Sequence, residues 1–167
     1  NSVIRKIQAL DEVYERVNLV KIYNYFLSVS KEPEILMNVI QCADRIRDKS
    51  TLGALLDILL MKNIENEKDA FINVRAMCAK AIANLKDTSA VTPLLYCLNN
   101  KDENYKVRLA CADALGRIGD RYAVAPLIEV VKDEVLPKLN FESKEIGIIA
   151  PYNNQVNKLK SEIDNQQ

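Results

Sequence analysis

The first residues to consider for chemistry are four cysteines, because thiolates can act as nucleophiles or bind metals. They are Cys42, Cys78, Cys97 and Cys111, with no CxxC pair among them, and the chain contains no histidine. The common zinc-binding spacings are therefore absent. Three of the four lie among Ala, Ile and Leu at helical spacing, where a cysteine packs as a small hydrophobic side chain. We expect no metal, no cofactor and no redox role.

Phosphate-binding and charged motifs give no catalytic site either. ATP hydrolysis needs a Gly-rich turn followed by Lys and then Ser or Thr, and this pattern does not occur in the chain. Nor does an acidic pair follow a buried strand. The charged clusters around Asp11, Glu12 and Glu15, and from Asp44 to Asp48, have spacings typical of solvated helix surfaces. We therefore expect no ATP hydrolysis by this chain.

Composition favours a helical protein without a strong electric field. The 167 residues include 49% hydrophobic and 28% charged residues and only four Gly. Lys plus Arg and Asp plus Glu both total 23, so the bulk positive charge of non-specific nucleic-acid binders is missing. No apolar run is long enough to span a bilayer, and no signal-peptide pattern is present, so we expect a cytoplasmic protein that does not enter membranes.

The strongest signal is a repeat with a period of 33 residues. Nine residues between Val74 and Leu94 recur identically between Val107 and Leu127. The recurring residues, written as first-copy positions, are Val74, Arg75, Ala79, Ala81, Asp87, Ala90, Val91, Pro93 and Leu94. A period between 20 and 50 residues indicates stacked supersecondary units.

Each unit is predicted to contain two helices. In residues 107–118, apolar side chains recur every three or four residues, and residues 90–98 are almost wholly apolar with Pro93 in the first turn. Gly119 follows the helix as a left-handed cap, and Lys86 lies at the equivalent place. Ala112 is expected at a tight contact between helices. The pattern continues upstream with an offset of 39, and helices are expected at 2–10 and 13–27. About three and a half units result.

Residues 107–133, "VRLACADALGRIGDRYAVAPLIEVVKD", resemble the HEAT-like repeat also found in phycobilin lyases. The resemblance extends with less fidelity over about residues 33–133. It implies an all-α fold, a right-handed α-solenoid. It also implies a ladder between neighbouring units, in which an Asp in the turn bonds an Arg near the start of the second helix. Asp69 with Arg75, and Asp102 with Arg108, keep this spacing, and we interpret all four as structural.

The repeat pattern stops before its fourth unit is complete. After residues 122–133 the period changes, Pro137 breaks the helix, residues 146–149 are predicted as a short strand, and an amphipathic helix follows Pro151. The segment "IGIIAPYNNQVNKL", residues 146–159, resembles a strand-to-helix element of superfamily 1 RNA and DNA helicases. That resemblance makes Pro151, Tyr152 and Gln155 candidates for a nucleotide or nucleic-acid site. Ala150 departs from the Thr often found there.

We therefore expect a repeat domain at residues 1–134 and a non-repeat tail at 135–167, and three functions compete. The first is a scaffold that binds an unidentified protein without catalysis. The second is an accessory region of a helicase, with nucleic acid as the partner and an ATP-dependent parent protein. The third is an enzyme on HEAT-like repeats, a bilin lyase or a base-excision glycosylase. The aromatic cluster of Tyr14, Tyr23, Tyr25 and Phe26 is expected to cover the end of the stack.

Overall fold

A computed structural model of the chain describes residues 2–9, 15–61 and 69–132. Most of these residues are helical, and no strand occurs among them. They fall into two compact units that divide between Ala123 and Val124. The helices are α1 (Ser2–Ala9), α2 (Arg16–Val29), α3 (Pro33–Ile46), α4 (Leu52–Leu60), α5 (Asp69–Leu85), α6 (Val91–Asn99), α7 (Tyr105–Ile118) and α8 (Val124–Val130). The first seven belong to the first unit, and α8 belongs to the second.

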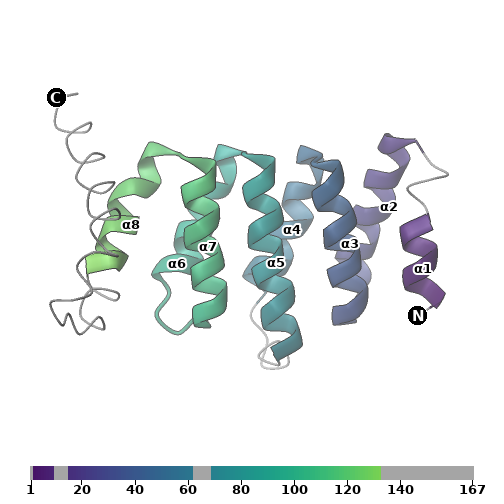
Figure 1. The fold of residues 1–167 in the computed structure, drawn as a ribbon, viewed down its shortest axis with the longest axis horizontal. Helices are drawn as coiled ribbons and strands as arrows, with labels where there is room; N and C mark the ends of the chain where they lie inside the picture. The colour runs from purple at the N-terminus through teal and green to yellow at the C-terminus, as the bar shows by residue number, and fades with distance from the viewer. Residues whose placement is uncertain (1, 10–14, 62–68, 133–167) are drawn as a thin grey trace, which may run out of the picture. The chain divides into compact units, whose positions relative to one another are not determined.

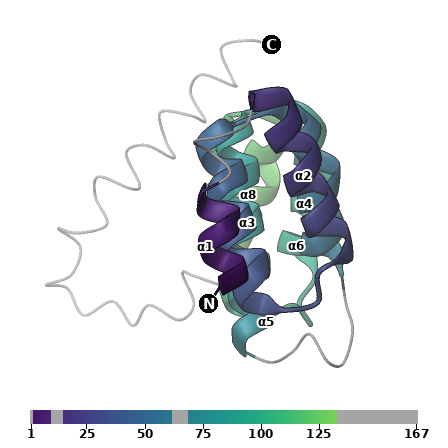
Figure 2. The ribbon, with the colours of Figure 1, turned by 90° about the vertical axis from the view of Figure 1, so that its right-hand side faces the viewer.

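The first unit consists of two layers of helices. In Figure 1, α3, α5 and α7 run parallel and side by side in a front row, while α2, α4 and α6 lie behind them. The view in Figure 2 separates the same two layers. Contacts join each back helix to the front helix that follows it, as in α4 with α5 and α6 with α7. Neighbours within the front row also pack on one another, and α1 packs on α3. The predicted all-α fold of stacked helix pairs is therefore confirmed.

The end of each front helix has the same backbone conformation. The last helical residue is followed by one in the left-handed region, which lets the chain turn back sharply and satisfies a free carbonyl of the last turn. These residues are Arg47 with φ 53°, Lys86 with φ 49° and Gly119 with φ 73°. The predicted left-handed cap at Gly119 is confirmed, and the equivalent place of Lys86 takes the same conformation.

An aspartate follows each left-handed residue and fixes the start of the next helix. Its carboxylate accepts a hydrogen bond from the backbone N–H two residues later, as N-terminal capping residues do. The pairs are Asp48 with Ser50, Asp87 with Ser89 and Asp120 with Tyr122, at 3.0, 3.0 and 2.9 Å. A single 3₁₀ turn then leads into each back helix: η2 (Lys49–Thr51), η4 (Thr88–Ala90) and η5 (Arg121–Ala123).

The core of the stack is made by the residues that repeat. Cys78 and Cys111 are both fully buried, on α5 and α7, which lie parallel and adjacent in the front row. Ile82 and Leu115, at equivalent positions, are at most 1% exposed, and burying such a side chain contributes about 1.5–3 kcal/mol. Ala79 is also fully buried. Its repeat equivalent Ala112 is only half-buried, because α7 is the last helix of the row in the first unit.

The predicted helices are present where the structure describes them, but their limits differ by one to three residues. The helix expected at 90–98 is α6, which is shifted by one residue and has Pro93 in its first turn, and the one expected at 107–118 is α7, which starts two residues earlier. The helix expected at 13–27 is α2, which starts only at Arg16, after the non-helical Glu15, and extends to Val29. The domain limit expected at 134/135, the strand at 146–149 and the helix after Pro151 lie outside the described residues.

Candidate functional site

A buried ion pair links two neighbouring helix pairs. The Arg75 guanidinium donates from Nη1 to Glu103 Oε1 at 2.9 Å and from Nη2 to Oε2 at 2.5 Å. Its Nε donates to the Leu59 carbonyl oxygen at 2.9 Å. The side chains of Arg75 and Glu103 are 6% and 4% exposed. Such a forked pair is a strong, directional contact, and a charged residue is seldom buried this far without one.

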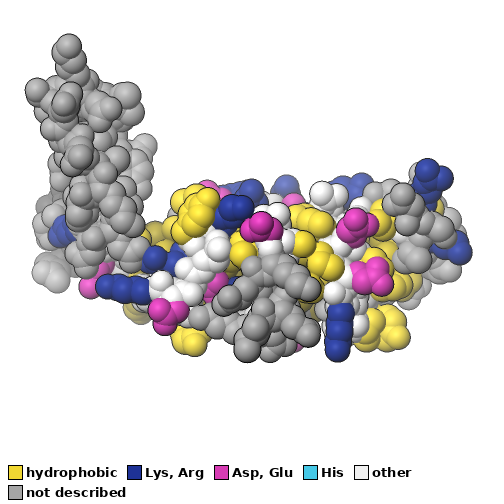
Figure 3. Space-filling model, turned by 90° about the horizontal axis from the view of Figure 1, so that it is seen from below, with side chains coloured by type: hydrophobic (Ala, Val, Ile, Leu, Met, Phe, Trp, Pro, Cys, Tyr) yellow, Lys and Arg dark blue, Asp and Glu magenta, His cyan; other side chains and the backbone are white. Residues whose placement is uncertain are grey.

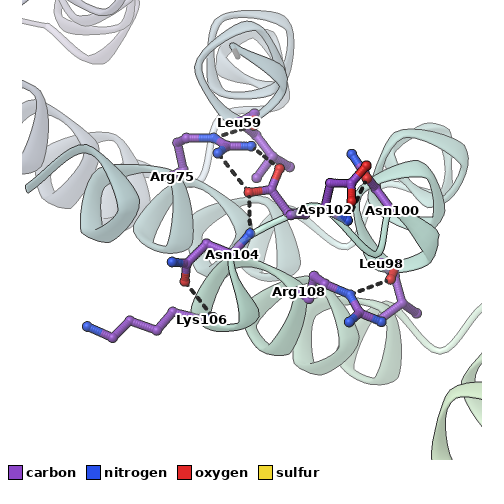
Figure 4. Close-up of polar contacts among 9 residues, drawn as sticks. Leu59, Arg75, Leu98, Asn100, Asp102, Asn104, Lys106 and Arg108 are labelled. Carbon is purple, nitrogen blue, oxygen red and sulfur yellow. Dashed lines mark hydrogen bonds and ion pairs between the residues drawn. The ribbon is translucent and has the colours of Figure 1, made fainter. Parts of the chain in front are cut away.

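The turn between α6 and α7 places Glu103 on Arg75. The Asn100 side-chain oxygen accepts from the Asp102 N–H, and the Asn100 carbonyl accepts from the Glu103 N–H. Glu103 Oε1 also accepts from the Asn104 N–H at 2.8 Å. The Glu103 carboxylate therefore contacts both the Arg75 guanidinium and the start of α7; Arg75 and Asn104 are labelled in Figure 4. The turn is therefore fixed on the helix pair before it.

Arg108 repeats one part of this arrangement. Its Nε donates to the Leu98 carbonyl oxygen at 2.9 Å, as Arg75 does to Leu59. Leu59 and Leu98 are each the second-last residue of a back helix, where carbonyl groups have no intrahelical partner and the helix dipole favours a positive charge. Both arginines therefore cap the back helix that precedes them. Arg108 is half-buried, unlike Arg75.

The acid that bonds Arg75 is not one of the predicted aspartates. Asp102 is exposed in the turn, and Asp69 is exposed as the first residue of α5. The expected link between neighbouring units is present, but Glu103 makes it, one residue after Asp102. The longer glutamate side chain reaches the guanidinium while the Asp102 backbone is held by Asn100. In the sequence Glu103 had no distinguishing spacing, so its role was missed.

A second polar chain crosses the front row on its exposed side. The Asn84 side-chain amide of α5 donates to Asp44 Oδ1 of α3 at 2.6 Å. Its oxygen accepts from Arg117 of α7, which also lies 3.9 Å from Asp113. We call Asp44, Asn84 and Arg117 the polar ladder. It joins all three helices of the row and restricts the movement of their surface side chains.

Around the ladder, the exposed positions of the front row differ from helix to helix. We define the row face as nine residues at three sets of repeat-equivalent positions, all exposed except the half-exposed Asn84. They are Glu34, Asn73 and Lys106; Gln41, Lys80 and Asp113; and Arg45, Asn84 and Arg117. Figure 3 shows another face, seen from below, on which acidic, basic and hydrophobic side chains of the described residues are interspersed without a patch of one charge.

The cysteines do not form a reactive site. All four are buried. Burial raises the pKa of the Cys78 thiol, and a hydrogen bond with Cys97, together with burial, raises the pKa of the Cys111 thiol. Both thiols are therefore protonated at neutral pH and are poor nucleophiles. Within the part of the chain that the structure describes, no group of three or more Cys, Asp or Glu side chains could hold a metal ion.

The aromatic residues near the amino end have different surroundings. Tyr23 is fully buried, whereas Tyr25 is 62% exposed and makes an edge-to-face contact with Phe26 at 5.9 Å. Tyr14 lies outside the described residues. Tyr23 therefore packs in the core of the first unit, and Tyr25 is left on its surface.

The family of the repeats follows from a comparison with known families. A family model described as HEAT repeats matches residues 60–139. This stretch of the chain is therefore similar to HEAT repeats. It includes α5, α6 and α7 with the Arg75–Glu103 pair. No curated protein matches the chain, and no helix in the described residues is long and apolar enough to cross a membrane.

The candidates from the helicase resemblance are not part of this HEAT match. Pro151, Tyr152 and Gln155 follow residue 139 and lie outside the described residues. Their suggested role in binding nucleotide or nucleic acid stays a prediction from sequence. The geometry that the structure does describe is a helical stack with a buried joint and an exposed, polar row face.

Proposed function

We propose that this chain is a scaffold that binds a protein partner on the row face. The observation that carries the proposal is the contrast between the inside and the outside of the repeat. Buried positions keep their chemistry from one helix to the next, as Cys78 and Cys111 do. Exposed positions of the same helices do not: Gln41, Lys80 and Asp113 are equivalent.

Stacking alone explains the constant interior, because each unit must fit its neighbours. It places no demand on the exposed side, where any polar residue keeps the protein in solution. An amide, a cation and an anion at equivalent places form a surface with a distinct pattern, and such patterns determine which partner binds and in which register. The polar ladder adds pre-organisation, since Asn84 is held between Asp44 and Arg117.

The size of the row face suits a protein partner. The shorter front helices have 14 residues, so each is about 21 Å long. With helices about 10 Å apart, the three of them present roughly 600 Å². A standard protein interface buries about 800 Å² on each side. A partner on this face alone would therefore bind through an interface at the small end of the specific range.

Charge favours a protein over a nucleic acid as the partner. Phosphate backbones are held by clusters of Lys and Arg. The row face instead mixes Lys80, Lys106, Arg45 and Arg117 with Glu34 and Asp113, and the whole chain is balanced at 23 positive and 23 negative residues. Helicase-accessory and lyase functions have no support from the described residues beyond the shared repeat.

The experiment is affinity capture with matched surface variants. Lys80→Glu with Asn84→Arg reverses the charge pattern at the middle of the row face without touching the core. Thr92→Glu, exposed in the first turn of α6 on the back row, is the control. We expect one stoichiometric protein with the wild type and the control and its loss with the row-face variant. Equal capture by all three, or salt-sensitive binding of single-stranded RNA or DNA in place of a protein, would contradict the proposal.

A further inference from the structure

The last helix of the front row carries an exposed apolar seam. Tyr105 and Leu109 of α7 are 70% and 67% exposed, Gly116 is exposed and Ala112 is half-buried. Their spacings of four, three and four residues place all of them on one side of the helix. The same spacing defines the seam along which two helices pack in a coiled coil. We call these four residues the end face.

One repeat earlier, on α5, most of the equivalent positions are buried. The equivalent residues of α5 are Ile72, Ala76, Ala79 and Ala83, three of which are at most 7% exposed. Helix α5 packs on α7 within the first unit. Positions that are covered by a neighbouring front helix in one repeat are therefore open to solvent in the next. Large apolar side chains exposed in this way mark interaction surfaces.

We propose that the end face binds the end face of a second copy of this chain, with the two α7 helices antiparallel. A symmetric dimer requires one surface to be complementary to itself. The end face meets this condition, because it has large residues toward one end and small residues toward the other. In the antiparallel register Tyr105 covers Gly116 of the second copy, and Leu109 covers Ala112 of the second copy. Each large side chain faces a small one, as in interdigitated cores.

The charged residues beside the end face favour the same antiparallel arrangement. Lys106 and Asp113 are exposed along one edge of the end face, where they directly follow Tyr105 and Ala112. In the antiparallel register Lys106 lies opposite Asp113 of the second copy, and the symmetry forms this ion pair twice. A parallel dimer would leave Lys106 and Asp113 without this pairing, stack Tyr105 on Tyr105 and leave Gly116 opposite Gly116. Residues flanking a helical seam determine partner orientation in this way.

The dimer shares Lys106 and Asp113 with the edge of the row face but leaves its middle, Lys80 and Asn84 of α5, uncovered, so it does not depend on the proposed protein partner. Four residues of one helix form a seam much smaller than a standard interface, and small interfaces are typically transient. We therefore expect a concentration-dependent dimer and not a permanent one. The monomer mass is 18.9 kDa, and the weight-average mass should rise toward twice this value as concentration increases.

Sedimentation of the full chain at rising concentration tests the proposal. Lys106→Asp and Asp113→Lys each place like charges opposite one another, so each variant alone should be monomeric. An equimolar mixture of the two restores both ion pairs and should dimerise. Gly116→Arg should also abolish dimerisation while leaving the fold intact, because nothing lies within 4 Å of a Cβ added there. Lys80→Glu, an exposed charge change on α5, is the matched control and should dimerise like the wild type.

The outcomes against the proposal are equally specific. A wild type that stays monomeric throughout, as when another part of the chain covers the end face, overturns it. A weight-average mass that grows beyond two copies also overturns the proposal, because the chains then assemble into an open stack and not into a closed dimer. Failure of the mixture to recover the dimer would refute the antiparallel register. Because the row-face variant, Lys80→Glu with Asn84→Arg, is expected to lose the protein partner but keep the dimer, the two proposals fail independently.

Discussion

The buried pair of Arg75 and Glu103 should be a large contribution to the stability of the stack. Its two hydrogen bonds measure 2.9 and 2.5 Å between side chains that are 6% and 4% exposed. Hydrogen bonds to charged groups contribute about 1.5–3 kcal/mol each, so roughly 3–6 kcal/mol depends on the pair. Removing one partner also leaves the other charge buried. We expect Arg75→Met and Glu103→Leu each to lower the free energy of unfolding by about 3–5 kcal/mol.

The double variant distinguishes an ion pair from two independent contacts. Arg75→Met with Glu103→Leu leaves no unpaired charge, so its loss should fall short of the sum of the single losses by at least about 2 kcal/mol. Urea unfolding followed by circular dichroism measures all four proteins. The exposed pair Asp113 and Arg117, 3.9 Å apart on one helix, is the control and should couple by about 0.5 kcal/mol or less. Single losses below about 1 kcal/mol, or additive losses, would refute the reasoning.

Four further predictions concern the core, the caps, acid and the thiols. Ala79→Phe should destabilise the folded protein by about 1–3 kcal/mol through overpacking. Ala112→Phe, at a half-buried site, should change the melting temperature little in dilute solution. Equal effects of the two substitutions on the melting temperature would contradict the assigned burial. Gly119→Ala should lower the stability of the fold by about 1 kcal/mol because φ is 73° at this position. Gly116→Ala, inside α7 with open space around it, should raise the stability by up to about 1 kcal/mol. Thermal melting of the two variants measures both changes. Hydrogen bonds from the Ser50 and Ser89 side chains hold the pKa of Asp48 and of Asp87 below the ordinary value. The stability that these carboxylates contribute is therefore present above an unfolded pKa of about 3.9 and is lost as the pH falls through the lower folded pKa. Ser50→Ala with Ser89→Ala should lower the free energy of unfolding at pH 7, and this loss should shrink as the pH falls through that range. The buried thiols should react with a disulfide reagent only when urea unfolds the protein, and rapid labelling of the native state would show that they are accessible.

The repeat made most of the front and back rows predictable. Stacking requires small and apolar residues at fixed positions, so the identical spacing around Cys78 and Cys111 was sufficient to identify α5 and α7 as neighbours. The left-handed cap was predicted only at Gly119; the repeat placed Lys86 at the equivalent position, and the structure shows the same conformation there. These features depend on local sequence and its period.

What could not be predicted depends on contacts between distant residues. Glu103 is buried because Arg75, 28 positions earlier, is aimed at it; nothing near Glu103 in the sequence distinguishes it from the exposed Asp102. The polar ladder likewise joins Asp44 to Asn84 across 40 positions. The exposure of Ala112 depends on which helix is last in the row, whereas the repeat treats all of its copies as equal.

The polar ladder gives the front row a direction. An amide has one end that donates and one that accepts, so Asn84 can satisfy a carboxylate on one side and a guanidinium on the other. Asp44 on α3 and Arg117 on α7 are therefore fixed as opposite electrical poles of one surface. If the proposed partner is elongated and lies across the three helices, its own charged ends match these poles in only one of its two orientations. We therefore expect the row face to distinguish the two ends of such a partner.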